Sequence, residues 1–217
     1  MTDTQEFPNL HVVDHPLVLH KLSHLRDKTT STTDFRSLLR EMALLIGYEI
    51  TRRLDMSTKV IETPITQLEA PVLDSIKPAI VPVLRAGLGM AEGLSQLLPT
   101  APIGHIGLFR DPKTKRPIEY YVRLPENKNR LFILVDPMLA TGYSASYAVD
   151  LLNKYGVPDT RIRFMAMVAA PEGMRAFNEA HETVEVWAAA LDEKLNDKAY
   201  IVPGLGDAGD LAFGEKI

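Results

Sequence analysis

The chain has 217 residues, of which 46% are hydrophobic and 24% charged, a composition typical of a globular protein and not of a disordered chain or a coiled coil. At roughly 150 residues per domain, this length predicts one domain with an appendage. The absence of cysteine excludes disulfides and thiolate metal sites, and the net charge of −4 disfavours nucleic acid and anionic membrane as partners. No apolar run is long enough to span a membrane, so the composition predicts a cytoplasmic protein.

An amphipathic helix is predicted in the first quarter of the chain, with Thr32 or Thr33 as its N-cap. Its apolar positions recur three and four residues apart: Phe35, Leu38, Leu39, Met42, Leu45 and Ile46. His20 and His24 have the spacing of a zinc-binding helix, but Lys21 stands where that motif needs glutamate. We therefore expect the two histidines on a solvated helix face.

From residue 79 onward, short apolar runs alternate with segments of helix length. The runs are 79–84, 103–109, 131–135, 162–168 and 184–189, and the intervening helices are predicted at 90–98, 145–155 and 172–181. Runs that are apolar at nearly every position suggest strands covered on both faces, as in a parallel sheet. Residues 136–161 are enough for a loop, a helix and a return, which is a βαβ unit. The sequence thus predicts an α/β fold with a mainly parallel, twisted sheet flanked by helices.

Two segments stand outside this alternation. Residues 110–123, with Asp111, Pro112 and Lys113 near the start, are interpreted as a two-stranded arm. The C-terminal tail from residue 200 is rich in glycine and leaves no room for a helix of useful length. Because ligands of open α/β sheets bind beyond the carboxyl ends of the strands, the loops after the strands are the expected place for a functional site.

The segment after the run 131–135 has the features of an anion site. This phosphate loop consists of Asp136, Pro137, Met138, Leu139, Ala140, Thr141, Gly142, Tyr143 and Ser144, and it leads into a predicted helix. Main-chain N–H groups at the helix start, together with the hydroxyls of Thr141 and Ser144, could surround a phosphate. The alternative is a plain strand-to-helix connection in which one hydroxyl caps the helix and Asp136 faces water.

The string VDPMLATG, residues 135–142, resembles the phosphate loop of the type I phosphoribosyltransferases. In this form, with proline in place of a second acid, it is similar to that of the uracil phosphoribosyltransferases. The resemblance implies that residues 136–144 bind phosphoribosyl pyrophosphate (PRPP). One position departs from the family, which usually has glycine where this chain has Tyr143. If that residue needed a positive φ, tyrosine would be strained there.

Two arginines extend the resemblance. Arg85, within residues 81–89, matches the family segment that holds the pyrophosphate of PRPP, and Arg110 matches a second pyrophosphate arginine at the base of the arm. For either arginine alone, a surface ion pair is the simpler role. Gly87, Gly89 and Gly93 do not form a dinucleotide fingerprint, because the last spacing is one residue too long.

The tail loop, residues 200–210, has the sequence YIVPGLGDAGD and contains a literal G-x-G-x-x-G that no later strand and helix can complete. A flexible tail is the simplest interpretation. The string is, however, similar to the uracil-binding loop of uracil phosphoribosyltransferases. That similarity implies main-chain contacts from Ile201, Gly206 and Ala208 to uracil, and contact of Asp207 with uracil, with PRPP or with its metal. Further similarity at residues 15–22 and 169–173 extends the resemblance over nearly the whole chain.

The resemblance implies transfer of a phosphoribosyl group from PRPP to uracil, giving UMP and diphosphate in pyrimidine salvage. Arg85 and Arg110 would stabilise the leaving diphosphate and Asp136 would hold the ribose hydroxyls. Magnesium would be carried mainly by PRPP, with Asp207 as one protein ligand. The resemblance also implies a homodimer or homotetramer and, in some members, GTP as an effector.

The same resemblance implies one domain, 1–217, with a core at about 72–190, an arm at about 110–123 and a hood formed by about 1–50 and 191–217. Three other functions fit parts of the pattern. A phosphoribosyltransferase for orotate or a purine would share the phosphate loop but not the tail loop. An RNA-binding regulator would need a basic face, which the net charge disfavours. A homologue without activity would follow if Tyr143 impaired the phosphate loop.

Overall fold

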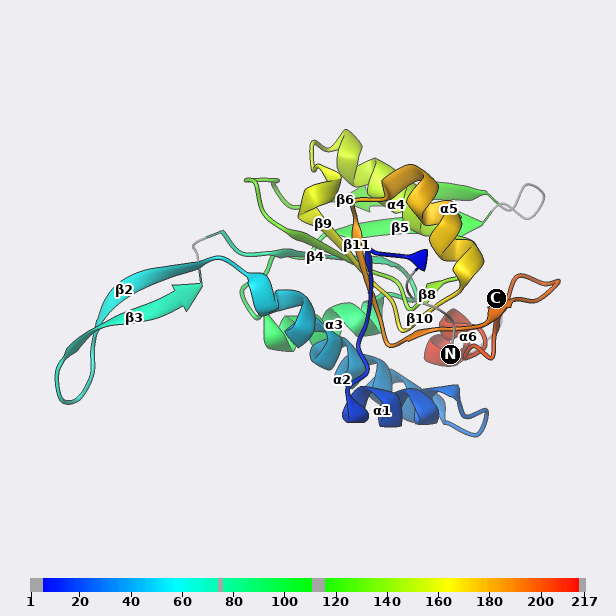
Figure 1. The fold of residues 1–217 in the computed structure, drawn as a ribbon, viewed down its shortest axis with the longest axis horizontal. Helices are drawn as coiled ribbons and strands as arrows, with labels where there is room; N and C mark the ends of the chain where they lie inside the picture. Colours follow the sequence, from blue (N-terminus) through cyan, green and yellow to red (C-terminus); the bar gives the residue numbers. More distant parts are fainter. Residues whose placement is uncertain (1–5, 74–75, 111–115, 215–217) are drawn as a thin grey trace.

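A computed structural model describes residues 6–73, 76–110 and 116–214. Its centre is a seven-stranded sheet in the order β1-β11-β9-β7-β4-β5-β6 (Figure 1). The strands are β1 (Leu10–Val12), β4 (Ala79–Leu84), β5 (His105–Arg110), β6 (Pro117–Arg123), β7 (Phe132–Val135), β9 (Ile162–Met165) and β11 (Glu185–Ala188). Neighbouring strands are parallel except β5 and β6. The predicted α/β fold with a mainly parallel sheet is confirmed.

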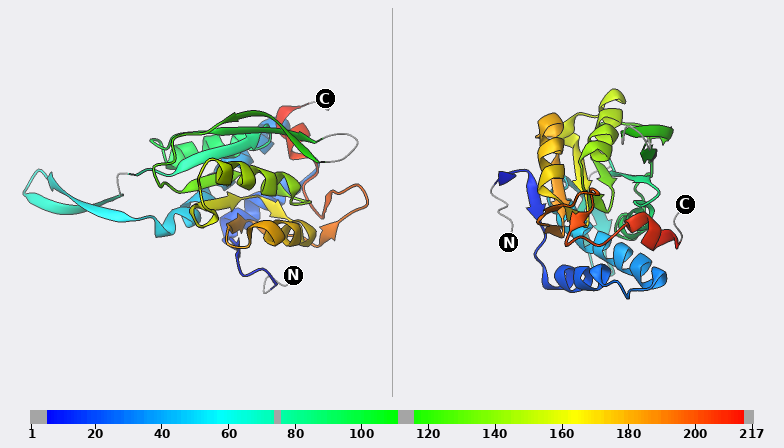
Figure 2. Two further views of the ribbon diagram at one scale, coloured as in Figure 1. Left: turned by 90° about the horizontal axis from the view of Figure 1, so that it is seen from above. Right: turned by 90° about the vertical axis from the view of Figure 1, so that its right-hand side faces the viewer.

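Helices cover both faces of the sheet (Figure 2). One layer contains α1 (Pro16–Arg26), α2 (Thr32–Ile50), α3 (Leu88–Leu97) and α6 (Ala208–Phe213), and the other contains α4 (Tyr143–Lys154) and α5 (Pro171–His181). Successive residues of β7 point into opposite cores: Ile133 and Val135 pack with the first layer, and Phe132 and Leu134 with the second. Two buried faces explain the unbroken apolar runs in the sequence.

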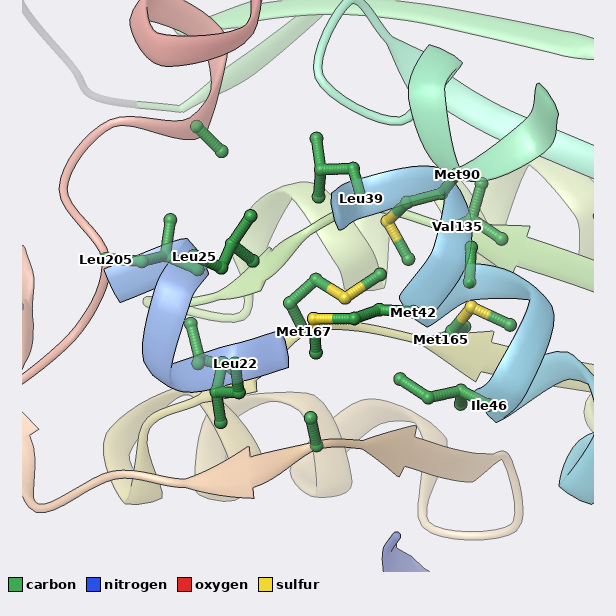
Figure 3. Close-up of a cluster of buried hydrophobic side chains, with 14 of the residues drawn as sticks. Leu22, Leu25, Leu39, Met42, Ile46, Met90, Val135, Met165, Met167 and Leu205 are labelled. Atoms are coloured by element: carbon green, nitrogen blue, oxygen red, sulfur yellow. The ribbon is translucent and has the colours of Figure 1, made fainter. Parts of the chain in front are cut away.

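The core under the first layer is rich in methionine. Met42, Met90, Met165 and Met167 are fully buried and meet Leu39 between α2, α3 and the sheet (Figure 3). Flexible thioether side chains fill irregular space between helices that cross a twisted sheet. The same buried cluster also contains side chains of α1 and of the tail loop, so this core holds both against the sheet.

The predicted cap of α2 is wrong by one residue. Ser31 is the N-cap, and its Oγ accepts a hydrogen bond from the N–H of Asp34 at 3.1 Å. An N-cap needs an extended backbone, and Ser31 has it with φ −67° and ψ 157°, whereas Thr32 and Thr33 already lie inside the helix. On α1, His20 and His24 are exposed, as expected for a solvated helix face.

Two predicted strands are each divided in the structure. The run 162–168 ends as β9 at Met165 and resumes as β10 (Val168–Ala169), and the run 184–189 is followed by β12 (Ala190–Leu191). Between β9 and β10 the main chain takes a new hydrogen-bonding partner: the N–H of Met167 donates to Pro137 O at 2.9 Å, directly before β8. Strands β8 (Met138–Leu139), β10 and β12 form a second, three-stranded parallel sheet in the order β12-β10-β8.

The predicted two-stranded arm at 110–123 is only partly correct: an antiparallel hairpin is present, but it pairs β6 with β5, which was predicted as a separate strand of the sheet. Its two strands run from His105 to Arg110 and from Pro117 to Arg123, so β5 begins inside the predicted strand 103–109. Asp111, Pro112 and Lys113 lie outside the described residues. Short 3₁₀ turns occur at Thr51–Arg53 and Asp159–Arg161.

A second hairpin is absent from the sequence-based prediction. Strands β2 (Met56–Glu62) and β3 (Gln67–Leu73) pair only with each other and extend away from the central sheet (Figures 1 and 2). All seven residues of β2 are exposed. This hairpin precedes the amino end of β4, so it lies at the opposite end of the sheet from the carboxyl edge. In the described part of the chain, no helix is long and apolar enough to cross a membrane.

Candidate active site

The loops after β4 and β7 start side by side at the carboxyl edge of the sheet. The two strands are parallel neighbours, with Pro82 opposite Val135, and β5 lies on the other side of β4. A Cβ on Gly87 would lie 2.4 Å from Val135 O, so the turn after β4 packs directly on the end of β7. The chain therefore brings Arg85 and Asp136 to adjacent strand ends, where ligands of open α/β sheets bind.

The first half of the phosphate loop is held by main-chain hydrogen bonds. The N–H of Asp136 donates to Met165 O at 3.1 Å, and Asp136 Oδ1 accepts from the N–H of Met138 at 3.3 Å. Met138 and Leu139 form β8, so part of the predicted loop is strand. The side chains of Pro137, Leu139 and Ala140 are buried. Only the main chain of these residues can meet a ligand.

The second half of the loop forms the start of α4. Gly142 is the N-cap with φ +80°, and no side chain caps the helix, so the predicted alternative of a capping Thr141 or Ser144 is wrong. Main-chain N–H groups of an uncapped first turn lack helical partners and can bind an anion. A Cβ on Gly142 would lie 2.7 Å from Gly173 O, and thus both the φ angle and the space require glycine.

Tyr143 is the first residue of α4 and has no positive φ. The positive φ of this turn falls on Gly142 instead, so the strain considered for a tyrosine at position 143 does not arise. The Tyr143 side chain is 58% exposed. Thr141 and Ser144 are half-buried beside it.

Arg85 faces an aromatic ring of the tail. Its guanidinium carbon lies 5.0 Å from the ring centroid of Phe213, and that of Arg36 lies 5.9 Å from the same centroid. Arg36 Nε also donates to Ala212 O, which fixes the end of α6. Among the described residues no carboxylate pairs with Arg85, so the alternative of a surface ion pair is not observed there. Arg110 ends β5, and its main chain is opposite Pro117.

The tail loop has a defined conformation. Strands β13 (Lys194–Leu195) and β14 (Ile201–Val202) pair antiparallel, and Gly204 and Gly206 have φ angles of +63° and +82°. Asp207 caps α6, since its Oδ1 accepts from the N–H groups of Gly209 at 2.9 Å and Asp210 at 3.1 Å. The α6 helix has only six residues, which agrees with a tail too short for a helix of useful length.

A hollow of about 410 Å³ lies between the end of α1 and the tail loop. Its lining includes Arg26, Lys28, Tyr200, Gly206 and Asp207. Asp27 also lines it, and hydrogen bonds from the Thr29 hydroxyl and main chain lower the pKa of the Asp27 carboxyl. The hollow thus has acidic and basic groups on its rim and apolar side chains such as Phe35 and Leu205 within it.

The tail loop and the phosphate loop share one core. Leu205 and Ala208 belong to the same buried cluster as Ala140 and Met167. On the other side, the start of α5 lies against the phosphate loop, because a Cβ on Gly173 would be 2.3 Å from Ala140 O. Residues 169–173, which carry part of the sequence resemblance, therefore support the phosphate loop.

The carboxylates available to a metal are few. Among the described residues, no group of three or more His, Cys, Asp or Glu side chains could hold a metal ion. Asp136 and Asp207 supply carboxylate oxygens, the ligand type that Mg²⁺ prefers, but not a complete coordination shell. This donor set fits a magnesium ion that takes most of its ligands from substrate oxygens and water.

Three residues near the site were missed by the sequence reasoning: Arg26, Asp192 and Phe213. Arg26 and Asp192 form a bidentate ion pair that also bonds Gly204, and Phe213 stacks on Arg85. The partners are separated by more than a hundred positions, so no local spacing could have indicated them.

The parallel sheet with an anion loop at its carboxyl edge is the fold of a type I phosphoribosyltransferase. A family model described as uracil phosphoribosyltransferase matches residues 12–215. The chain belongs to the uracil phosphoribosyltransferase family, a group of pentosyltransferases.

Similar proteins agree with this assignment. A uracil phosphoribosyltransferase of Rhodospirillum centenum is 63% identical over 97% of this chain and 98% of its own length. One from Burkholderia thailandensis is 58% identical over the full length of both chains. The solved structure of the AQ2163 protein from Aquifex aeolicus is 35% identical, covers 96% of this chain and 99% of its own, and superposes with a TM-score of 0.90.

Proposed function

We propose that this chain transfers the phosphoribosyl group of PRPP to uracil, giving UMP and diphosphate for pyrimidine salvage. The observation that carries the proposal is the uncapped start of α4, at the end of the loop that begins with Asp136 and beside the strand end that bears Arg85. Family membership supplies the substrate pair, and the tail loop supplies a structured segment for the base.

The reaction replaces diphosphate by uracil at ribose C1 and develops positive charge on the sugar ring. Main-chain N–H groups within residues 138–144 and the hydroxyls of Thr141 and Ser144 bind the 5′-phosphate. Arg85 and Arg110 stabilise the negative charge that grows on the leaving diphosphate. Asp136 orients the ribose hydroxyls beside the cationic carbon. Asp207 would act as a protein ligand of a magnesium ion otherwise held by PRPP oxygens, and that ion would supply further charge neutralisation.

The tail loop distinguishes uracil from cytosine through its main chain. Uracil presents two carbonyl acceptors with an N3–H donor between them, so alternating N–H and C=O groups from Ile201, Gly206 and Ala208 complement it. Cytosine has no proton at N3 and leaves a carbonyl of the loop unpaired, which a buried site rejects strongly. Gly206 is exposed and has a φ of +82°, which allows close approach of the backbone to the base.

The test is formation of UMP and diphosphate from uracil, PRPP and Mg²⁺ by the purified chain. We expect turnover with uracil and little with cytosine, orotate or a purine base. Turnover with orotate or a purine alone would assign a different phosphoribosyltransferase activity. No turnover with any base, together with salt-sensitive RNA binding, would favour the regulator instead.

We propose one domain of residues 1–217, in which residues 1–50 and 191–217 form a hood over the site and 110–123 form an arm beside it. The contacts of Phe213 with Arg85 and of Arg26 with Gly204 support a hood made from both ends of the chain.

The family resemblance also predicts activation by GTP in some members. A titration with GTP in the UMP assay, with ATP as control, tests that prediction.

The β2–β3 hairpin supports a homodimer or a higher homo-oligomer as the assembly. Its apolar side chains are exposed, with Ile65 at 91%, Val60 at 59% and Met56 at 57%. A hairpin that pairs with nothing else is marginal in water, and both of its faces carry apolar residues. A second copy of the chain, related by a two-fold axis, would cover the apolar side chains of this hairpin, and the symmetry would cover the same hairpin in both copies.

Sedimentation of the wild type and of Ile65→Asp and Val60→Asp variants tests this assembly. We expect the wild type to sediment as a dimer or larger, and the two variants to shift toward the monomer. Lys59→Glu, on the same strand, is the control for added charge alone. A wild type that remains monomeric at micromolar concentration would contradict the proposal.

A further inference from the structure

One residue of the tail loop, Gly204, is held through both of its main-chain polar groups by charged side chains. Arg26 Nη1 donates to Gly204 O at 2.7 Å, and the N–H of Gly204 donates to Asp192 Oδ2 at 2.9 Å. The two side chains also bind each other, at 2.7 Å from Nη1 to Oδ2 and 2.6 Å from Nη2 to Oδ1. Gly204 therefore has both main-chain polar groups fixed by one ion pair.

This pair is largely removed from solvent, since the side chain of Asp192 is 4% exposed and that of Arg26 is 21% exposed. A buried ion pair contributes little to stability compared with apolar residues of the same volume, so its presence points to a need for a specific geometry. Gly204 has a φ of +63°, and a Cβ there would lie 2.1 Å from Ile201 O. The pair holds a turn that no other residue type could form.

The turn at Gly204 lies between the residues that we assign to the base. Ile201 precedes Gly204 and Gly206 follows it, so the orientation of the Gly204 peptide sets the direction of the main chain on both sides. Glu193 reinforces the connection, because its N–H donates to Val202 O at 2.9 Å. A shift of Gly204 would move the main-chain groups assigned to uracil.

The same ion pair connects the tail loop to the phosphate loop. Asp192 follows β12 directly, and its N–H donates to Ala169 O of β10 at 2.8 Å. Strand β10 pairs in turn with β8, which is part of the phosphate loop. Arg26 joins this unit from the end of α1. The position of the base relative to the sugar phosphate therefore depends on a continuous set of bonds through Asp192.

We propose that Arg26 and Asp192 are positioning residues that set the distance and angle between uracil and C1 of PRPP, and with them the preference for uracil over cytosine. They act through Gly204. This inference rests on the proposed function of the tail loop as the uracil site. It assigns base selectivity to side chains outside the loop that contacts the base.

The experiment compares Arg26→Lys and Asp192→Asn with the wild type in the full-length chain. Each variant keeps side-chain size close to the original but removes the bidentate geometry. Arg175→Lys is the matched control, because Arg175 makes a comparable pair with Glu6, at 2.6 and 3.1 Å, on the exposed surface of α5. The readouts are the KM for uracil, the KM for PRPP and the ratio of kcat/KM for uracil to that for cytosine.

We expect Arg26→Lys and Asp192→Asn to raise the KM for uracil by about ten- to a hundredfold and to lower the uracil-to-cytosine ratio, because small displacements of a positioning group have effects of this size. The KM for PRPP and all constants of Arg175→Lys should stay within about twofold of the wild type. A folded variant with an unchanged KM for uracil would overturn the inference. An equal rise of both KM values would also overturn it, since that is the mark of a general structural role.

A double variant separates positioning from folding. Arg26→Met with Asp192→Leu replaces the ion pair by apolar side chains, which commonly preserves stability in buried sites. We expect this variant to fold but to keep the raised KM for uracil, and recovery of the wild-type KM would overturn the inference. Failure of the wild type to form UMP would refute the proposed function instead. In that event, amide exchange at Gly204 decides the positioning role: faster exchange in Arg26→Lys supports it and unchanged exchange overturns it.

Discussion

The phosphate loop and the tail loop lie at the same edge of the molecule but are held in different ways. The phosphate loop is fixed by main-chain bonds of β8 and by close backbone contact between Gly142 and Gly173. The tail loop is fixed chiefly by two side chains: Arg26, from the other end of the chain, and Asp192, 12 residues before Gly204. A phosphate offers uniform oxygen acceptors that a backbone cradle can bind, whereas base selectivity depends on the placement of individual hydrogen-bonding groups.

The largest effect is expected at Asp136, the residue of the phosphate loop that we propose orients the ribose. Asp136→Asn keeps the shape of the side chain but removes its charge, and we expect kcat to fall by about a hundredfold or more. The KM for uracil should change much less, because Asp136 belongs to the phosphate loop. Steady-state kinetics measure both constants, and Glu179→Gln on the exposed side of α5 serves as control. Unchanged turnover would remove Asp136 from the mechanism.

A large effect on stability is expected at Gly142. Gly142→Ala places a Cβ at a φ of +80° and 2.7 Å from Gly173 O. We expect a loss of about 1–3 kcal/mol in the free energy of unfolding, together with weaker PRPP binding. Gly156→Ala is the control, because Gly156 has a φ of +85° but a Cβ there would have no neighbouring atom closer than 3.7 Å. This variant measures the cost of the backbone strain without the steric contact. Equal denaturation midpoints for the two variants would contradict the close contact.

An intermediate effect is expected at Phe213, where the tail touches Arg85, the arginine that we propose binds the diphosphate. Phe213→Leu removes the aromatic face 5.0 Å from Arg85, a cation–π contact that contributes about 0.5–2 kcal/mol. The KM for PRPP and the inhibition constant of diphosphate should rise several-fold, and the KM for uracil should not. Phe213→Tyr keeps the ring and should behave as the wild type. Equal constants for the leucine and tyrosine variants would show that the ring does not position Arg85.

The smallest effect is expected at Tyr143. Tyr143→Gly should change the apparent affinity for PRPP by no more than about threefold, because the tyrosine has no positive φ whose strain a glycine could relieve. The exposed ring can contribute only a weak contact to a bound substrate. Isothermal titration with PRPP and Mg²⁺ measures the change, with Tyr143→Ala to separate the lost ring from the added backbone freedom. Identical affinities would mean that the Tyr143 side chain has no part in binding.

The sheet was predictable because its signal is local. Strand β4 matches the predicted range at both ends, and β7 and β9 begin within one residue of their predicted starts. Strands β4 and β7 are apolar runs ended by Arg85 and Asp136, a pattern that requires no knowledge of the strands' partners. The phosphate loop was likewise recognisable as a string, since an acid, small residues and a hydroxyl follow one another directly in the chain.

The hairpin β2–β3 was not predictable in the same way. Its strands mix Lys59, Glu62 and Glu69 with apolar residues on both faces, so neither strict alternation nor an unbroken apolar run is present. The pairing of β2 with β3 is set by hydrogen bonds between the two strands and not by burial in this chain. The N-cap of α2 was also displaced, from the predicted Thr32 or Thr33 to Ser31, because caps depend on the backbone angles of single residues.

By itself the sequence determined the fold class, the strands of the central sheet from β4 onward and the location of the phosphate loop, because these depend on residues adjacent in the chain. Only the tertiary structure decided that Gly142 and not Tyr143 takes the positive φ, that Phe213 stacks on Arg85, and that Arg26 and Asp192 hold Gly204. These features need groups far apart in sequence to meet in space. Their geometry follows from how the helices and the second sheet pack, and no local pattern contains that information.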